Sequence, residues 1–426
     1  MNSIQITELI ENGAFDKAFE RLYADTSTAR SRYINAVFNF SKIYGDRDNI
    51  RIFSVPGRTE VSGNHTDHNN GKVLAASVDL DIIAVAAENS GNEIRIKSHG
   101  FDMDTVDISN LSRGAYPKFS SAALIAGMCD GFLNRGYCVG GFDAYTTSDV
   151  IKGSGLSSSA AFEVMVGNIL NCMFNGGTIS APTIAMIAQY AENEFFGKPC
   201  GLMDQCACAV GGFVYIDFEN PRLPKIEKLD FDLSKAGFNL CITNTGGSHA
   251  SLNDDYASIP LEMKSVAKHF GKEVLREITL ENVISDISGL RRECGDRAVL
   301  RALHFLDEND RVERQRTALK EGDTDAFFSL VKASGESSKA LLQNIYSVKN
   351  VNEQGLSVAL DISRRSLEGK RGAYRVHGGG FAGTIQAFVL SDDTENYKNN
   401  QEAVFGKGQC HVLHIRPYGA LEVTVI

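Results

Sequence analysis

The order in which strand-like and helix-like stretches follow one another limits most strongly how this chain can fold. Helical spacing occupies residues 6–44, and short apolar runs punctuated by Gly and Asn then predict strands, among them 50–55 and 71–87. Helical spacing returns in 118–133 and 157–174. Because there is no regular strand–helix–strand alternation, the sequence predicts an α+β fold rather than a doubly wound parallel sheet.

Further elements follow from the same periodicities. Residues 6–44 predict two amphipathic helices. Residues 180–195 predict a helix with Ser180 as its N-cap, Pro182 in its first turn and Gly197 as its stop. The elements predicted later in the chain are three charged amphipathic helices and two strands: 293–320, 324–342, 351–367, 373–376 and 384–390.

Chain length and one connection indicate two domains. At about 100–200 residues per domain, 426 residues correspond to two or three domains. Pro221 and Pro224, the closest prolines in the chain, separate two strand-like runs. We therefore predict an N-terminal domain of residues 1–220 and a C-terminal domain of residues 221–426.

Charge and cysteine content exclude several classes of protein. Lys and Arg number 43 against 53 Asp and Glu, a net charge of −10, which does not favour binding to nucleic acid or to an anionic membrane. No apolar run approaches the ~18 residues that span a bilayer, and the first residues do not resemble a secretory signal. The nine cysteines include no C-x-x-C pair and are typical of free thiols, so we expect a cytoplasmic protein.

The segment GSGLSSSAA (153–161) runs directly into an apolar helical pattern. Glycines and serines that open a helix expose backbone N–H groups at its positive end, where they can bind phosphate oxygens. A serine-rich cap with glycines for a tight turn explains the same letters. The segment is neither a Walker loop nor a nucleophile elbow, so two large enzyme classes are excluded.

The segment GGGFAG (378–383) formally satisfies G-x-G-x-x-G. The residues after it predict a strand, whereas a dinucleotide-binding fingerprint requires a helix there, so we reject that interpretation. The glycines serve either a hairpin with positive φ angles or the close approach of a ligand or neighbouring loop.

The segment 56–71 (PGRTEVSGNHTDHNNG) is too polar for a core. Asp and Asn side chains suit paired sugar hydroxyls, and Arg58 suits phosphate. A metal site on His65, Asp67 and His68, or an Asn-rich hairpin loop, would use the same residues. Further along, Asp204 precedes an apolar run, where a carboxylate is either paired internally or catalytic.

Together these segments resemble the galactokinase branch of the GHMP small-molecule kinases. The resemblance extends from about Arg51 to the C-terminus, with the three motifs 56–71, 153–161 and 378–383 in the family's order and CGLMDQ (200–205) in addition. It implies a two-domain fold, with an N-terminal α+β domain, a ferredoxin-like C-terminal domain and the active site between them.

The resemblance also implies an ATP-dependent sugar-1-kinase that converts D-galactose to galactose 1-phosphate, with a small-molecule sugar and ATP as its partners. Asp204 would take the proton from the anomeric hydroxyl or orient it, and Arg58 would stabilise charge on the transferring phosphoryl group. Mg²⁺ would be held by Ser159 and Glu192. A monomer is plausible.

The remaining site residues implied by the resemblance fall into two groups. The implied ATP-binding residues are Gly153, Gly155, Leu156, Ser157, Ser158, Ser159, Gly379 and Gly380. The implied sugar contacts are Asn64, His65, Asp67, Gly201 and Tyr256.

The chain departs from the family pattern PGR-x-N-hydrophobic-x-GEHTDYN-x-G at several positions. Asn64 stands where the family's acidic residue meets the C6 hydroxyl, and His68 replaces its Tyr. Thr59 and Glu60 replace the usual small residue and Asn. Galacturonate or L-arabinose is therefore an alternative substrate, and a catalytically silent galactose sensor or a metal hydrolase built on His65, Asp67 and His68 is an alternative function.

Overall fold

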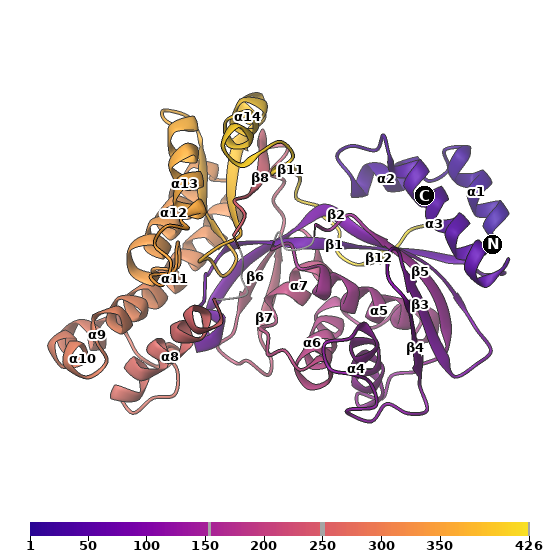
Figure 1. The fold of residues 1–426 in the computed structure, drawn as a ribbon, viewed down its shortest axis with the longest axis horizontal. Coiled ribbons are helices and arrows are strands. Elements are labelled where there is room, and N and C mark those ends of the chain that lie inside the picture. The colour runs from indigo at the N-terminus through magenta and orange to yellow at the C-terminus, as the bar shows by residue number, and fades with distance from the viewer. Residues whose placement is uncertain (152–154, 248–251, 425–426) are drawn as a thin grey trace.

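The computed structural model describes residues 1–151, 155–247 and 252–424, which are arranged around two β-sheets (Figure 1). The predicted phosphate-binding residue Gly153 lies outside the described residues.

Three helices precede the first strand: α1 (Ser3–Glu11), α2 (Asp16–Leu22) and α3 (Ala29–Tyr44). The prediction of two helices in this segment was wrong, because the chain turns at Gly13, whose φ is +79°, and α2 begins after that turn. Asn2 caps α1 in a capping box with Gln5. The apolar faces of α1, α2 and α3 form a separate core against strand residues such as Ile83 and Val85.

The first sheet has the strand order β12-β1-β2-β5-β3-β4, and β6 and β7 extend it from β2. Neighbouring strands are antiparallel except for β3 and β5. The strands are β1 (Arg51–Ser62), β2 (Lys72–Glu88), β3 (Glu93–Ser98), β4 (Met103–Asp107), β5 (Phe142–Ser148), β6 (Phe213–Asp217), β7 (Lys225–Leu229) and β12 (Leu421–Glu422).

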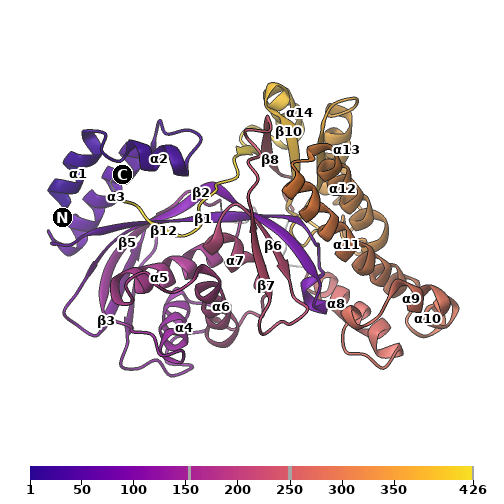
Figure 2. The ribbon, with the colours of Figure 1, turned by 180° about the vertical axis from the view of Figure 1, so that it is seen from behind.

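Helices cover both faces of this sheet at one end. α1–α3 lie on one face, and α4 (Ser121–Leu133), α5 (Ser158–Phe174), α6 (Ala181–Ala191) and α7 (Met203–Val210) lie on the other (Figure 2). α6 continues into a single π-helical turn, η2 (Glu192–Phe196). As predicted, Ser180 caps α6 by accepting from Thr183 N–H, and the helical segment ends at Gly197 with φ +89°.

The second sheet is antiparallel, in the order β11-β8-β10-β9. Its strands are β8 (Phe238–Asn244), β9 (Gly372–His377), β10 (Thr384–Leu390) and β11 (Cys410–Leu413). Its helices are α8 (Asn253–His269), α9 (Leu280–Ser285), α10 (Ile287–Glu293), α11 (Asp296–Glu321), α12 (Thr324–Ser337), α13 (Gly355–Ser366) and α14 (Thr394–Phe405). Short helical turns complete the described part: η1 (Asp67–Asn69), η3 (Leu275–Glu277), η4 (Ser338–Leu342) and η5 (Ser391–Asp393).

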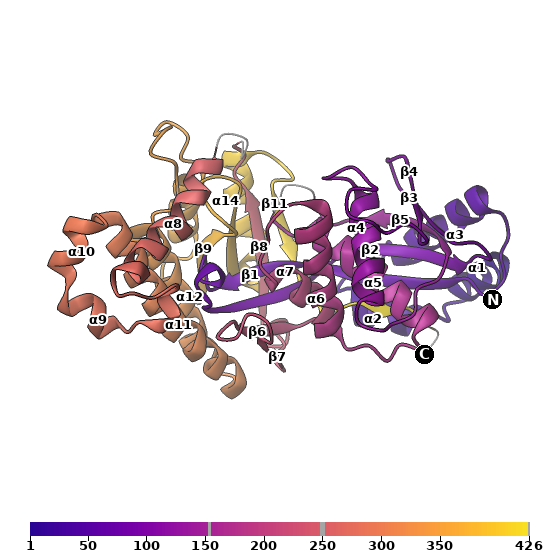
Figure 3. The same cartoon turned by 90° about the horizontal axis from the view of Figure 1, so that it is seen from below.

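The loops that carry the sequence motifs lie where the two sheets approach each other. β1 contacts β9 and α12, and α11 packs against β2 (Figure 3). The strand after 378–383 confirms that this glycine cluster is not a dinucleotide fingerprint. The boundary at residue 220 stays a prediction; β7 and β12, which follow it, both pair within the first sheet.

Candidate active site

The glycine–serine loop leads into α5, and Arg58 of β1 holds its described part. The Arg58 N–H donates to the Leu156 carbonyl at 3.1 Å, and its guanidinium also donates to the Gly155 carbonyl. Ser157, at the N-cap, has a φ of +55°, and its side chain does not cap the helix. Within the described residues, the N–H groups of the first turn of α5 are therefore open to an anion.

Arg58 also forms a two-pronged ion pair with Asp204, in the first turn of α7. Arg58 Nε donates to Asp204 Oδ1 and Nη2 to Oδ2, both at 2.6 Å, and the Ser157 hydroxyl donates to Oδ2 as well. Burial raises the pKa of Asp204, but the guanidinium and the hydroxyl outweigh it and hold the pKa below its ordinary value. Asp204 is therefore a carboxylate at neutral pH, 30% exposed.

A second acidic cluster lies between α5, η2 and α7. Gln205 Nε2 donates to Glu192 Oε2 at 2.8 Å and to Glu163 Oε2 at 3.2 Å. Lys198 pairs with Glu192 Oε1 at 3.3 Å. Of these two buried carboxylates, Glu192 pairs with the ammonium, whereas Glu163 Oε1 has no hydrogen-bond partner in the described structure.

This cluster fits a bound divalent cation. Ser159 lies one helical turn before Glu163 on α5, so the two side chains share a face of the helix. Mg²⁺ commonly takes one or two protein ligands and completes its coordination with substrate phosphates and water. The Glu192 carboxylate and the Ser159 hydroxyl are ligands of the kind that this requires.

The polar segment after β1 folds back against residues 378–383, the glycine loop. His65, with φ +58°, donates from Nε2 to the Gly379 carbonyl at 2.9 Å. Burial, together with the neighbouring His68, lowers the pKa of His65 to about 4, so its imidazole is neutral. Asn64 is only 1% exposed, and it donates from Nδ2 to Glu60 Oε1 and to the Gly378 carbonyl, each at 2.7 Å.

Asp67 and Gly201 lie directly against each other, although they are far apart in sequence. A Cβ atom added at Gly201 would lie 2.3 Å from Asp67 Oδ2, so a side chain there would force Asp67 to move. The glycine thus allows the backbone before α7 to approach the carboxylate.

Three consecutive backbone carbonyls of the glycine loop accept hydrogen bonds from side chains of neighbouring segments. Asn64 binds the Gly378 carbonyl, His65 and Asn344 bind that of Gly379, and the Tyr256 hydroxyl binds that of Gly380 at 2.8 Å. A Cβ atom at Gly379 would lie 2.6 Å from the Tyr256 ring, so the glycine is required by this packing. Gly380, with φ +82°, lies against the Asn344 carbonyl.

The structure thus brings together Arg58 and Asp204 with the phosphate loop, and Asn64, His65 and Tyr256 with the glycine loop. The roles assigned to these residues stay predictions. Several buried residues that join the loops were not among the predicted site residues: Glu60, Glu163, Gln205, His304, Asn344 and His377. Only Glu163 carries a sequence signal, since an acidic residue inside the apolar pattern of α5 is unusual.

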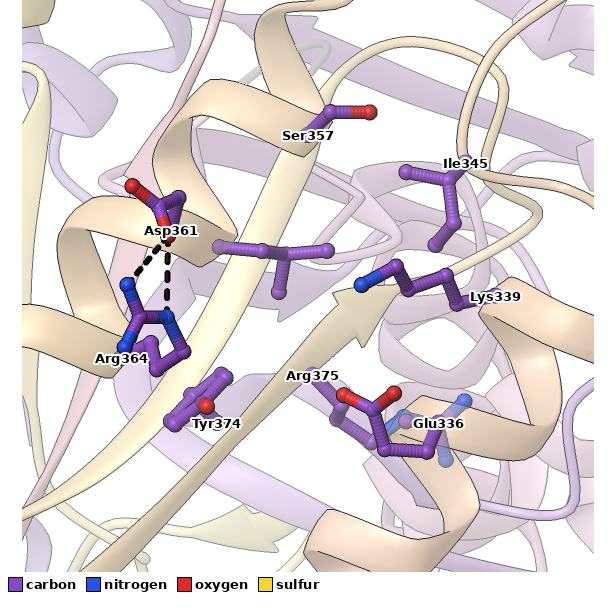
Figure 4. A pocket seen from close by; sticks show the side chains of 10 residues that line it. Glu336, Lys339, Ile345, Ser357, Asp361, Arg364, Tyr374 and Arg375 are labelled. Carbon is purple, nitrogen blue, oxygen red and sulfur yellow. Dashed lines mark hydrogen bonds and ion pairs between the residues drawn. The ribbon is translucent and has the colours of Figure 1, made fainter.

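Two cavities of the described structure are lined by other residues. One, of about 130 Å³, is lined by residues of α12, η4, α13 and β9, including Lys339, Asp361 and Tyr374, and its Asp361 accepts from Arg364 Nε at 3.0 Å (Figure 4). The other, of about 530 Å³, lies beside Gly355 and Phe381. Neither is lined by a predicted site residue.

Within residues 1–151, 155–247 and 252–424, no group of three or more His, Cys, Asp or Glu side chains is arranged to hold a metal ion. No helix in the same residues is long and apolar enough to cross a membrane.

Comparisons with known proteins agree with the arrangement. The family model "GHMP kinases N terminal domain" matches residues 120–212, and "Galactokinase galactose-binding signature" matches residues 39–88. A galactokinase of Lactobacillus helveticus is 30% identical over 362 residues, covering 83% of this chain and 89% of that protein. One of Clostridium tetani is 28% identical over 380 residues, covering 86% and 92%.

Solved structures share the fold. A Lactococcus lactis galactokinase complexed with galactose has a TM-score of 0.75 at 22% identity, covering 91% of this chain and 98% of that one. The Methanococcus jannaschii mevalonate kinase has a TM-score of 0.60 at 15% identity, covering 87% and 99%. The predicted two-domain α+β fold of GHMP kinases is confirmed. On the strength of these relatives, the chain is an enzyme of the galactokinase family, within the GHMP kinases.

Proposed function

We propose that this enzyme transfers the γ-phosphoryl group of ATP to the anomeric hydroxyl of D-galactose, giving galactose 1-phosphate and ADP. The observation that carries the proposal is the Arg58–Asp204 pair, which joins the end of the phosphate loop to the first turn of α7. The galactose-binding signature over residues 39–88 and the galactose complex of the Lactococcus lactis protein support galactose as the sugar.

The phosphates of ATP bind the N-terminal turn of α5 and the loop before it, with Gly379 and Gly380 closing the other side. The residues proposed for this role are Gly153, Gly155, Leu156, Ser157, Ser158 and Ser159. Ser159 and Glu192 are the residues that would hold Mg²⁺, which when bound would neutralise phosphate charge. Uncapped N–H groups and a partly unbalanced acidic cluster support these assignments.

Asp204 orients the anomeric hydroxyl by accepting its hydrogen bond. The pKa of this carboxyl is held low beside Arg58, so Asp204 is a weak proton acceptor, and positioning is the larger part of its work. The Arg58 guanidinium, fixed by Asp204 and the Gly155 carbonyl, stabilises negative charge on the transferring group. The hydroxyl proton passes along this hydrogen bond to the Asp204 carboxylate as the oxygen–phosphorus bond forms and the bond between the γ-phosphorus and ADP breaks.

The sugar lies between the segment after β1 and the loop before α7. Asp67 and Gly201, which face each other, and His65 and Tyr256, which are fixed against the glycine loop, are the proposed contacts. Asn64 was predicted to join them; its hydrogen bonds to Glu60 and Gly378 bear on that role below. A cytoplasmic location remains a proposal from the cysteine content, and the nine thiols are free in the structure.

A panel of hexoses and pentoses with ATP and Mg²⁺ tests the proposal by ADP release and by phosphorus NMR of the product. We expect galactose-dependent ADP formation, a resonance for a 1-phosphate ester, and loss of turnover in EDTA. Galactose binding without ADP formation would indicate a sensor, and turnover that is unchanged in EDTA would refute the kinase assignment.

A further inference from the structure

Glu60 is a buried carboxylate in the middle of the candidate site for which the proposed mechanism has no use. It lies two residues after Arg58 on β1, and the pairing of β1 with β2 is regular between them, so both side chains point to the same face. The Glu60 N–H donates to His377 Nε2 at 3.4 Å. The side chain is 9% exposed.

The two carboxylate oxygens of Glu60 differ in their surroundings. Oε1 accepts from Asn64 Nδ2 at 2.7 Å and lies 3.8 Å from Arg375 Nη2. Oε2 accepts no hydrogen bond in the described structure, yet it is not sealed in, since the fully buried unpaired oxygens are others, such as Glu163 Oε1. Glu60 is thus nearly buried, but its Oε2 keeps some exposed surface on which it can accept a hydrogen bond.

Charged residues that are predicted to bind the phosphoryl group and the sugar act on the ionisation of Glu60. Burial raises the pKa of Glu60, and Arg375 and Arg58 act against that rise, whereas Asp67 adds to it. Arg58 and Asp67 are assigned to the phosphoryl group and to the sugar, respectively. The Glu60 carboxylate is therefore close enough to Arg58 and Asp67 for their charges to act on it.

Asn64, in contrast, has its hydrogen-bonding groups occupied. Both of its N–H donors are used, by Glu60 and by the Gly378 carbonyl, and its Oδ1 accepts from Asn344 Nδ2 at 2.6 Å. Its backbone carbonyl accepts from His304 Nε2 at 3.0 Å. Asn64 thus fixes Glu60 and the glycine loop, and little of its polar surface is left for a ligand.

We propose that Glu60, through Oε2, accepts a hydrogen bond from the C6 hydroxyl of the sugar, and that Asn64 positions this carboxylate. The inference rests on the proposed function and specifies its substrate class. The C6 end is assigned because Glu60 is in direct contact with Asn64, which stands where the family resemblance implies a contact to the C6 hydroxyl.

The consequence is selection of a neutral hexose. A uronic acid would bring a second carboxylate against Glu60, and two like charges in a desolvated site repel strongly. A pentose without C6, such as L-arabinose, leaves the buried acceptor unpaired. The apparent loss of an acidic residue at position 64 is thus compensated four residues earlier.

Glu60→Gln is the primary test, because Gln keeps the shape and still accepts from Asn64 while removing the charge. We expect kcat/KM for galactose to fall about tenfold or more, as for loss of a hydrogen bond to a charged group. The value for L-arabinose should change by less than about threefold, and galacturonate should improve relative to galactose. An equal fall for galactose and L-arabinose, or a wild-type preference for galacturonate, would overturn the proposal.

Exchange of the two residues provides the second test. Asn64→Glu alone sets two carboxylates side by side, since Asn64 Nδ2 is 2.7 Å from Glu60 Oε1, and we expect it to lose galactose turnover. The double variant Glu60→Asn, Asn64→Glu should recover most of it. A single Asn64→Glu variant that improves galactose turnover would instead identify position 64 as the sugar contact.

Calorimetric binding of galactose to wild type and Glu60→Gln, without ATP, separates this inference from the proposed function. Weaker binding by the variant supports the contact even if no ADP forms in any reaction, a result that would refute the kinase assignment alone. Equal binding together with equal sugar selectivity refutes the Glu60 contact and leaves the kinase assignment standing.

Discussion

Asp204 is held between a guanidinium and a hydroxyl, and this pairing decides what a single substitution would do. Asp204→Asn keeps the shape and can still bond one arm of Arg58, but it removes the charge that aligns both the hydroxyl and the guanidinium. We expect kcat to fall by at least ~10²-fold, the lower end of acid–base and positioning effects. Steady-state turnover measures it, with far-ultraviolet circular dichroism to verify folding; near-normal turnover would remove Asp204 from the mechanism.

His65 gives a prediction for pH dependence. Burial lowers its pKa to about 4, below the ordinary 6.5, so the neutral ring that donates to Gly379 persists throughout the neutral range. We expect the ratio of kcat/KM between wild type and His65→Gln to be constant from pH 8 to about 5.5 and to change only as the pH approaches 4. The ratio cancels ionisation of ATP, which both proteins share. A break near pH 6.5 would show that His65 titrates as an ordinary exposed histidine.

At the scale of elements, Gly201 is the point where the loop before α7 contacts Asp67, in the polar segment after β1. Gly201→Ala would place a methyl group 2.3 Å from Asp67 Oδ2, so that Asp67 must move. We expect kcat/KM for galactose to fall about 10- to 100-fold, mainly through KM, because small misplacements of positioning groups are costly. Gly91→Ala, in an exposed turn where the nearest atom is 3.5 Å away, is the matched control and should be neutral. Equal KM values for the two variants would contradict the contact.

The junction of α5, η2 and α7 gives a prediction for the metal. Glu192→Gln still accepts from Gln205 but loses its charge, so it should lower kcat at least ~10²-fold while calorimetric binding of galactose stays within about twofold. Parallel loss of turnover and sugar binding would show that Glu192 supports the fold of the sugar site instead.

The sequence predicted the elements whose periodicities are strong, such as α5, α11 and β10. The loops that the sequence singled out do meet in the structure, whereas the chemistry assigned to them stays a prediction. The sequence could not predict which residues on those loops meet, because contacts such as Asn64 with Asn344 join positions 280 residues apart. The division of the N-terminal segment into three helices was missed because it depends on a single turn at Gly13.

At the scale of the whole molecule, one buried aspartate joins the N-terminal helices, the first sheet and the C-terminal segment. Asp81 of β2 accepts from the Tyr23 hydroxyl at 2.6 Å, from Arg32 Nη1 at 2.5 Å and from Arg416 Nη1 at 3.2 Å. Ser54 of β1 also donates to it. Arg32 additionally pairs with Asp149 at 2.8 Å, just after β5 and before the phosphate loop, so this network also anchors one approach to the active site.

Asp81→Asn would leave Arg416, which is fully buried, without its charge partner. We expect a loss of about 3–5 kcal/mol in the free energy of unfolding at pH 7, the usual cost of breaking a buried pair, measured by urea denaturation. Burial raises the pKa of Asp81, but Arg32 and Arg416 lower it by more, so its folded-state pKa is below the unfolded value of 3.8. The stability that Asp81 contributes is therefore present above pH 3.8 and disappears as the pH falls through the folded-state pKa. The difference in free energy of unfolding between wild type and Asp81→Asn should therefore be constant from pH 7 to about 5 and disappear only in strong acid. The control Asp392→Asn, at an exposed position, should have the free energy of unfolding of wild type throughout. A gap that already narrows near pH 6, or is absent at pH 7, would show that Asp81 does not hold these segments together through its charge.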